Sequence, residues 1–235
     1  MDISKLKIKY KELKALEDSD DGIFEFKNLL LKDDDEDVLQ FHIDILNDRD
    51  DPYLVRDIRS FFSKRKDQKK VSAFIATKIK DGIENPLLKA DLIQILGNLR
   101  SPLVKEIVHD EIKSANRDIR YRCIIVMGWV GTTMTDLDVL NERMINDEDG
   151  QLRGYAATAM RQIWYNKKSV KNRVTKYIKE AIESEKDPEA LTGMIITLQD
   201  LHKKKLGIKE SNYGDVSGDV QEAKLKAIKM LSKLK

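Results

Sequence analysis

The chain contains a segment that recurs at nearly constant spacing, and this repetition constrains its fold more than any other feature. Residues Asp118 to Val130 align without a gap with residues Gln151 to Ile163. In both segments the apolar positions fall at i, i+4, i+7, i+8 and i+11, which is the spacing of one stripe of an amphipathic helix. A small residue, Cys123 or Ala156, lies in the middle of each stripe, where another helix can approach closely. The recurrence predicts stacked helical repeats.

The same frame fits a segment upstream, from Leu88, and one downstream, from Ala190. Each copy follows a turn in which an Asn or Asp can cap the free N–H groups of the next helix, sometimes with a Pro in its first turn. These turns are Asn85-Pro86, Asn116 to Asp118, Asp147 to Gly150 and Asp187-Pro188, and Asp51-Pro52 has the same form. The helices expected between the copies are Val71 to Ile79, Leu103 to Ile112, Leu137 to Ile145 and Val170 to Ile182.

Composition agrees with long helices joined by short turns. The 235 residues include only 4 Pro and 11 Gly, and 6% are aromatic, which disfavours a β-sandwich with its frequent turns. We therefore expect an all-α fold, an α-solenoid of stacked antiparallel helix pairs that forms a single domain over residues 1–235.

Within that domain the repeats are expected over residues 51–204. Residues 1–50 form acidic N-terminal helices, Ile3 to Leu16, Ile23 to Leu31 and Val38 to Leu46, which act as a cap or a divergent repeat. A polar loop follows at residues 205–219, either functional or merely mobile, with mobility the favoured alternative. Residues 220–235 hold a C-terminal capping helix, because a terminal repeat has no neighbour to cover its face.

The repeated segments resemble HEAT repeats, and in particular the short HEAT-like subtype of phycobilin lyases. An Asp at the turn, a Val, Ile or Leu before an Arg, a small residue and then Leu or Met carry the resemblance. Asp118 to Gly128 and Asp149 to Met160 match best, and the likeness extends from about residue 50 to residue 204. Lys89 and Leu191 replace the Arg in their units, and Arg59 stands where a small residue is expected.

Charge is distributed unevenly along the chain. The 43 Lys+Arg and 41 Asp+Glu residues leave a formal net charge of only +2. Residues 17–57 nevertheless contain 15 acidic and 4 basic residues, whereas residues 166–235 contain 16 basic and 10 acidic residues. The densest acidic run is Asp33, Asp34, Asp35, Glu36 and Asp37. A fold that keeps chain order in space would therefore have an acidic end and a basic end.

The sequence lacks the usual catalytic motifs. It contains no G-x-S-x-G, no phosphate-binding glycine loop and no H-E-x-x-H. The histidines His42, His109 and His202 are widely spaced, and the single cysteine, Cys123, lies in an apolar run typical of a buried thiol. We expect no enzyme activity, cofactor or metal. Two acidic clusters, Asp18 to Gly22 and Asp147 to Gly150, leave calcium binding as a weak alternative. Neither a signal sequence nor a membrane span is expected, which favours a cytoplasmic location.

Binding residues are expected on the concave face, which the second helix of each pair lines. The positions expected to be exposed there are Asp91, Gln94, Arg100, Tyr121, Arg122, Tyr155, Arg161, Trp164 and Tyr165, with Trp129 close by. Aromatic and Arg side chains on one surface are typical of protein interfaces. In the alternative interpretation, Trp129 and Tyr155 fill gaps between repeats and the arginines pair with turn aspartates.

These observations predict a non-enzymatic protein-binding module, monomeric when free, whose partner is another protein. The architecture is similar to small bacterial immunity or inhibitor proteins, which implies a cognate toxin as partner. The concave face and the acidic run, Asp33 to Asp37, would receive a basic toxin such as a nuclease, because complementary charge favours association.

Two alternatives belong to other functional classes. The chain is also similar to HEAT-like alkylpurine DNA glycosylases, in which Trp129, Trp164, Arg122, Arg161 and Asp91 would take the roles of the Trp, Asp and Arg residues at the lesion. A near-neutral net charge is weak support for such phosphate binding. The resemblance to phycobilin lyases implies a role with a bound prosthetic group, which no residue supports.

Overall fold

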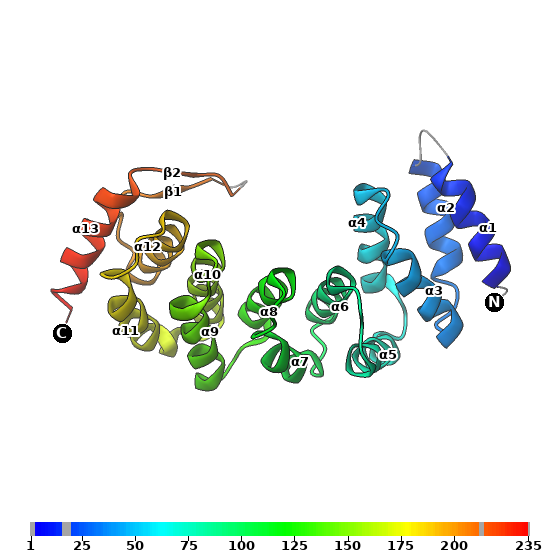
Figure 1. Ribbon diagram of the computed structural model, residues 1–235, viewed down its shortest axis with the longest axis horizontal. Coiled ribbons are helices and arrows are strands. Elements are labelled where there is room, and N and C mark those ends of the chain that lie inside the picture. The colour runs from blue at the N-terminus through cyan, green and yellow to red at the C-terminus, as the bar shows by residue number, and fades with distance from the viewer. Residues whose placement is uncertain (1–2, 16–19, 212–213, 235) are drawn as a thin grey trace. The chain divides into compact units, whose positions relative to one another are not determined.

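The computed structural model describes residues 3–15, 20–211 and 214–234. These residues form thirteen α-helices, two 3₁₀ turns and one short β-hairpin (Figure 1). Helices that follow one another in the sequence pack in pairs, as in a helical repeat solenoid. The fold is therefore all-α, as the periodicity predicts.

The chain divides into two compact units, Met1–Ile107 and Val108–Lys235. The boundary falls inside helix α7 (Val104–Glu111). The expected single domain stays a prediction.

Unit 1 consists of helix pairs. Its helices are α1 (Ile3–Lys14), α2 (Asp20–Leu30), α3 (Glu36–Leu46), α4 (Pro52–Phe61), α5 (Gln68–Asp81) and α6 (Pro86–Asn98), with a 3₁₀ turn at Phe62–Lys64. The pairs that pack together are α1 with α2, α3 with α4, and α5 with α6. Each contributes fully buried side chains to the core, among them Leu30, Leu39, Ile58 and Leu92.

Unit 2 has two layers of helices. It contains α8 (Arg117–Val130), α9 (Met134–Asn146), α10 (Gly150–Asn166), α11 (Lys171–Ile182), α12 (Pro188–His202) and α13 (Val220–Leu231), with a 3₁₀ turn at Lys168–Val170. Helix α10 packs against both α8 and α12 in one layer. Helices α9 and α11 pack against one side of this layer and form the second layer (Figure 1).

The repeat frame is confirmed at the level of single residues. The stripe residues Ile119, Cys123 and Met127 of α8 are buried, and so are their counterparts Leu152, Ala156 and Met160 of α10. The predicted caps are equally clear. The side chains of Asp51, Asn85, Asn116, Asp149 and Asp187 each accept backbone N–H groups in the first turn of the following helix.

The segment expected to be a polar loop contains a β-hairpin instead. Strand β1 (Lys209–Glu210) pairs antiparallel with β2 (Val216–Ser217). Leu206 and Ile208 are buried at its base, and the side chain of Gln199 in α12 bonds to the backbone of both residues. Nonlocal contacts of this kind leave no periodic trace in a sequence.

Unit 1 contains a fully buried histidine. The ring of His42 stacks on Phe62 with 3.6 Å between ring centroids. Its Nδ1 accepts from the Arg65 guanidinium at 3.1 Å, and its Nε2 lies 2.9 Å from the carbonyl oxygen of Ile58. This places the ring proton on Nε2. Burial, together with the Arg65 charge, lowers the pKa of His42 well below its usual value, so the ring is neutral in the fold.

Replacing Ala156 by Asp should destabilise the protein by about 4 kcal/mol or more, because it puts an unpaired charge where α10 packs against its neighbours. Gln162→Asp, on the exposed side of the same helix, should cost less than about 1 kcal/mol. Thermal unfolding of the two variants measures the difference. Equal melting temperatures would place the buried stripe on the wrong face.

Stability should fall as the pH drops from about 7 to 5. The unfolded chain takes up a proton at His42 near pH 6.5, whereas the folded chain does not, so the neutral form stabilises the fold only above that pH. The slope from this residue is about 1.4 kcal/mol per pH unit. In His42→Gln, urea unfolding at pH 7, 6 and 5 should show a slope smaller by that amount, and an unchanged slope would contradict the assignment.

Candidate functional site

Helices α8, α10 and α12 pack closely side by side in one layer. A Cβ atom on Gly128 would lie 3.0 Å from the Cα of Ala159, so α8 and α10 nearly touch there. Helices α10 and α12 are closer still, because a Cβ on Gly193 would lie 2.3 Å from the carbonyl oxygen of Gly154. Because glycine has no side chain, these positions allow the three helices to pack at short separation.

Four aromatic side chains of α8 and α10 are exposed or half-buried. Trp129 is 41% exposed and Tyr165 is 46% exposed. Tyr121 of α8 and Tyr155 of α10 are half-buried against each other, with 5.2 Å between ring centroids. We call Tyr121, Trp129, Tyr155 and Tyr165 the aromatic face. Arg122 lies beside it, with its guanidinium 5.0 Å from the Tyr121 ring centroid.

Two residues expected on this surface are buried instead. Trp164 is 8% exposed, and the Lys168 amine lies 3.6 Å from one of its ring centroids. Arg161 is 9% exposed because it donates to Asp200 of α12 and to Glu210 of the hairpin, each at 3.0 Å. The expectation that both are exposed is wrong, because carboxylates distant in the sequence draw Arg161 inward and α10 turns Trp164 toward the core.

The same cluster fastens the hairpin to the helices. The hydroxyl of Tyr165 donates to Asp200 at 2.6 Å, and this carboxylate also accepts from Arg161. Burial, with the nearby Asp200 charge, raises the pKa of Tyr165, so its hydroxyl stays protonated at neutral pH. The bond from Arg161 to Glu210 holds the hairpin near the C-terminal half of α10.

A groove of about 430 Å³ runs between α10 and α12 beneath the hairpin. Tyr155 and Thr158 line it from α10, and Thr192 and Ile196 line it from α12. The hairpin contributes a further wall through Glu210, Gly214 and Val216. The groove therefore adjoins the aromatic face through Tyr155.

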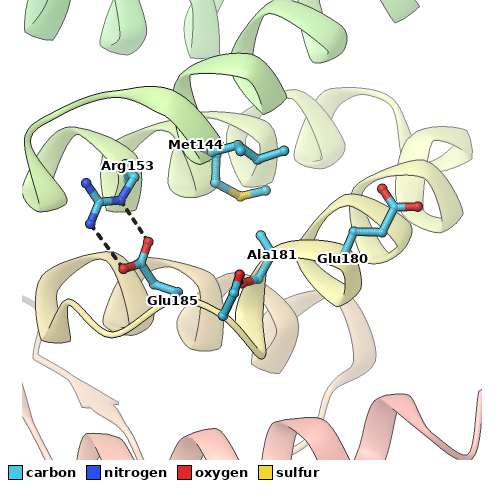
Figure 2. Close-up of a pocket in the computed structure, with 7 residues that line it drawn as sticks. Met144, Arg153, Glu180, Ala181 and Glu185 are labelled. Atoms are coloured by element: carbon cyan, nitrogen blue, oxygen red, sulfur yellow. Dashed lines mark hydrogen bonds and ion pairs between the residues drawn. The ribbon is translucent and has the colours of Figure 1, made fainter.

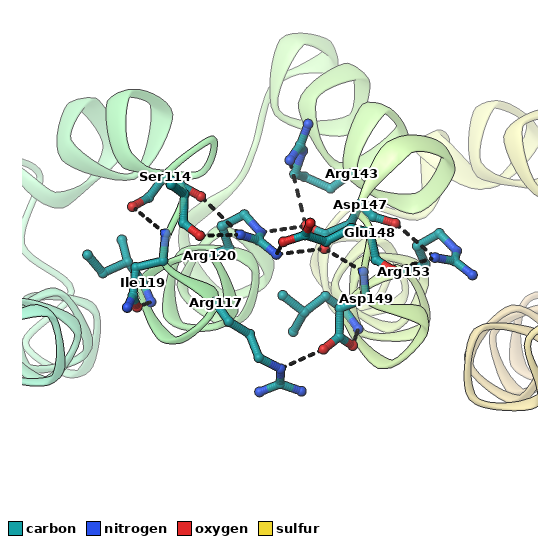
Figure 3. Close-up of polar contacts among 12 residues, drawn as sticks. Ser114, Arg117, Ile119, Arg120, Arg143, Asp147, Glu148, Asp149 and Arg153 are labelled. Atoms are coloured by element: carbon teal, nitrogen blue, oxygen red, sulfur yellow. Dashed lines mark hydrogen bonds and ion pairs between the residues drawn. The ribbon is translucent and has the colours of Figure 1, made fainter.

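Two arginines, the buried Arg120 and the half-buried Arg153, connect successive repeats of unit 2. Arg120 donates to Asp147 at 2.9 Å and to the carbonyl oxygen of Ser114, as Figure 3 shows. One repeat later, Arg153 donates to Glu185 at 2.7 Å and to the carbonyl oxygen of Asp147. We call these pairs the arginine ladder. Arg120 and Arg153 are not among the arginines expected on the binding surface, and their partners lie in the turns before the next helix of the layer.

Two residues of the arginine ladder, Arg153 and Glu185, also line a second cavity. A cavity of about 300 Å³ lies among α9, α10 and α11, with Met144, Ala181 and Glu180 on its walls (Figure 2). Its guanidinium and one of its carboxylates, Arg153 and Glu185, already bind each other. Burial would raise the pKa of Glu185, but the bonds from Arg153 and from two backbone amides outweigh it and lower that pKa. The polar groups here serve the fold.

The candidate residues of unit 1 are also tied up in the fold. Asp91 is 4% exposed, and its two oxygens accept from Arg49 and Arg59, each at 2.7 Å. Its expected exposure is therefore wrong, and the Arg59 that breaks the repeat pattern supplies one of its partners. Gln94, one turn further along α6, is half-buried.

The acidic run splits into two parts. Asp34 accepts from the buried Arg65 at 2.7 Å and from the backbone N–H of Asp67. Asp33 accepts the backbone N–H of Asp35, which precedes α3. The side chains of Asp35, Glu36 and Asp37 are exposed at the start of that helix, where the dipole favours negative charge.

The remaining candidates have structural surroundings. Cys123 is buried, as expected. Asp147 and Asp149 of one possible calcium cluster bind Arg120 and Arg117, while Asp18 and Ser19 of the other lie outside the described residues. Across residues 3–15, 20–211 and 214–234, no three His, Cys, Asp or Glu side chains are grouped as a metal site. Of the helices in these ranges, none combines the length and the apolar character needed to span a bilayer.

Sequence reasoning missed the hairpin and its carboxylate contacts. Glu210 and Asp200 are separated from Arg161 by 49 and 39 residues, and nothing in the helical period points to them. The four-lysine cluster near the end of α12 was the available signal that this segment differs from the repeats. It comprises Lys203, Lys204, Lys205 and Lys209 around a hollow of about 660 Å³.

No protein-family profile matches the chain, and no curated protein matches its sequence.

Removing a carboxylate from the arginine ladder should be costly. In Asp147→Ala, the Arg120 side chain, only 5% exposed, keeps its charge and its bond to the 81% exposed Glu148 but loses its buried carboxylate partner, so we expect a loss of about 3 kcal/mol. Arg117→Ala, which breaks the exposed pair with Asp149, should cost less than about 1 kcal/mol. Urea unfolding compares the two. Similar losses would show that the ladder is no more than a surface ion pair.

Proposed function

We propose that this chain is a non-enzymatic, HEAT-like protein-binding module whose aromatic face binds another protein. The observation that carries the proposal is the set of four aromatic side chains of α8 and α10 that remain exposed or half-buried. Tyr and Trp are the residues that most often dominate binding energy at protein interfaces. Gly128 packs directly against Ala159 between α8 and α10, and such close packing favours a preorganised surface that needs little ordering on binding.

We further propose that the module is an inhibitor or immunity protein for a basic toxin. The exposed Asp35, Glu36 and Asp37 would speed the approach of such a partner. Much of the other negative charge in unit 1 is matched internally, as in the bonds from Lys14 to Asp48 and Asp50. Electrostatic attraction therefore depends on the start of α3. The single buried cysteine fits a reducing, cytoplasmic setting.

Affinity capture from the native cell, followed by calorimetry with the purified partner, tests this proposal. Trp129→Ala and Tyr121→Ala should each weaken binding by about tenfold or more, because truncating an interface aromatic removes 1–2 kcal/mol or more. Tyr53→Ala removes a 73% exposed aromatic from unit 1 and serves as the matched control.

Equal affinity for Trp129→Ala and Tyr53→Ala would overturn the aromatic face as the binding surface. For the charged part, the association rate of the partner should fall when salt is raised, and this dependence should weaken in Asp35→Asn/Glu36→Gln/Asp37→Asn. A rate that salt does not change would remove the electrostatic proposal.

A second candidate function is nucleic-acid binding, and the four-lysine cluster favours it. Lys203, Lys204, Lys205 and Lys209 are exposed around one hollow, and ammonium groups bind phosphates without reading sequence. In a fluorescence anisotropy titration with duplex DNA at moderate salt, Lys203→Gln/Lys205→Gln should weaken binding more than Lys224→Gln/Lys226→Gln on α13. Equal loss in both pairs, or no binding, removes this candidate.

A further inference from the structure

The floor of the groove between α10 and α12 is made of backbone rather than side chains. Gly154 and Gly193 meet where the two helices are closest, and any larger residue at either position would collide with the opposite helix. Because no side chain rises from this point, the groove stays open along its length. A ligand lying in it would rest on the two helix backbones.

The walls of the groove are largely apolar. The hydroxyl of Thr158 donates to the carbonyl oxygen of Tyr155, and that of Thr192 donates to the carbonyl oxygen of Pro188. Both hydroxyls are thus occupied by their own helices. Val216 of the hairpin, 45% exposed, supplies an aliphatic group from the opposite wall.

The charged groups of the groove are carboxylates. Among the described residues that line it there is no Lys or Arg, although the chain has 43 of them. Glu189 lies exposed at the start of α12 and accepts a 3.3 Å bond from the amide of Gln151. Glu210 accepts from Arg161, which neutralises part of its charge. The groove is therefore negative at Glu189, and Tyr155, which also lines it, packs against Tyr121 of α8.

We propose that this groove receives an extended segment of the protein partner that carries a Lys or Arg beside an aliphatic residue. The aliphatic group packs between Thr158, Ile196 and Val216, and the cation lies by Glu189, where the Tyr121–Tyr155 pair offers a ring face. This inference rests on the proposed function, because it names the chemistry by which the partner is recognised.

The test uses the full chain with methyl-labelled Ile and Thr and three nine-residue peptides. Their central residues are Arg-Leu-Lys, Gln-Leu-Gln or Glu-Leu-Glu, each flanked by Gly and Ser. With the basic peptide, the methyl signals of Ile196, Thr158 and Thr192 should shift in a saturable way at concentrations up to about 5 mM, a range in which millimolar binding is measurable. The neutral peptide should bind at least about threefold more weakly and the acidic one about tenfold.

Two variants separate groove binding from general charge attraction. Thr192→Arg puts a cation into the groove and should weaken the basic peptide at least tenfold, whereas Gln221→Arg adds the same charge on α13 and should leave its affinity unchanged. Shifts elsewhere in the chain, equal binding of the acidic peptide, no shifts at all, or equal affinities of the two variants would each overturn the inference.

Failure of this inference differs from failure of the proposed function. If the captured partner is weakened by Trp129→Ala and bound unchanged by Thr192→Arg, the aromatic face stands and the groove does not. If Trp129→Ala leaves the partner's affinity unchanged while Thr192→Arg weakens it, the groove is the binding site and the aromatic face is not.

Discussion

The surface of unit 2 depends on how closely α8, α10 and α12 can approach one another. Gly128 against Ala159, and Gly154 against Gly193, bring helix backbones into direct contact. A side chain at Gly193 would push α10 and α12 apart, and with them the walls of the groove. The groove is one result of this packing constraint, because its floor lies where Gly154 and Gly193 meet.

Much of the fold could be predicted from local sequence. A cap such as Asn116 and a stripe such as Ile119, Cys123 and Met127 are encoded within a few residues, so helix starts and buried faces follow directly. The burial of residues that bind side chains distant in the sequence could not be predicted in this way. Asp91 is buried because Arg59 of α4 and Arg49 of the turn before α4 bind it, and within α6 alone its position looks like that of an exposed polar residue.

The candidate site was predictable in part for the same reason. Tyr121, Tyr155 and Tyr165 fall outside the buried stripe, and helix geometry alone leaves them exposed or half-buried. The groove was not predictable, since one of its walls is a hairpin that is held by Arg161, 49 residues from Glu210, and by a bond from the Gln199 side chain to the carbonyl oxygen of Ile208. The charge separation seen along the sequence is likewise reduced in space, because Lys14 and Arg65 return to the acidic segments.

The arginine ladder has a consequence for how such a chain can change in length. Each arginine lies four residues after its helix cap, at Asn116 or Asp149, and its carboxylate partner lies two residues before the next cap. The sequence positions of the two bonded residues are therefore fixed relative to the helix caps and do not depend on the length of the repeat. The two arginines bridge 27 and 32 residues to Asp147 and Glu185, yet they make the same bond. Residues can therefore be inserted within the intervening helix and its turns without breaking the arginine–carboxylate bond that connects successive repeats.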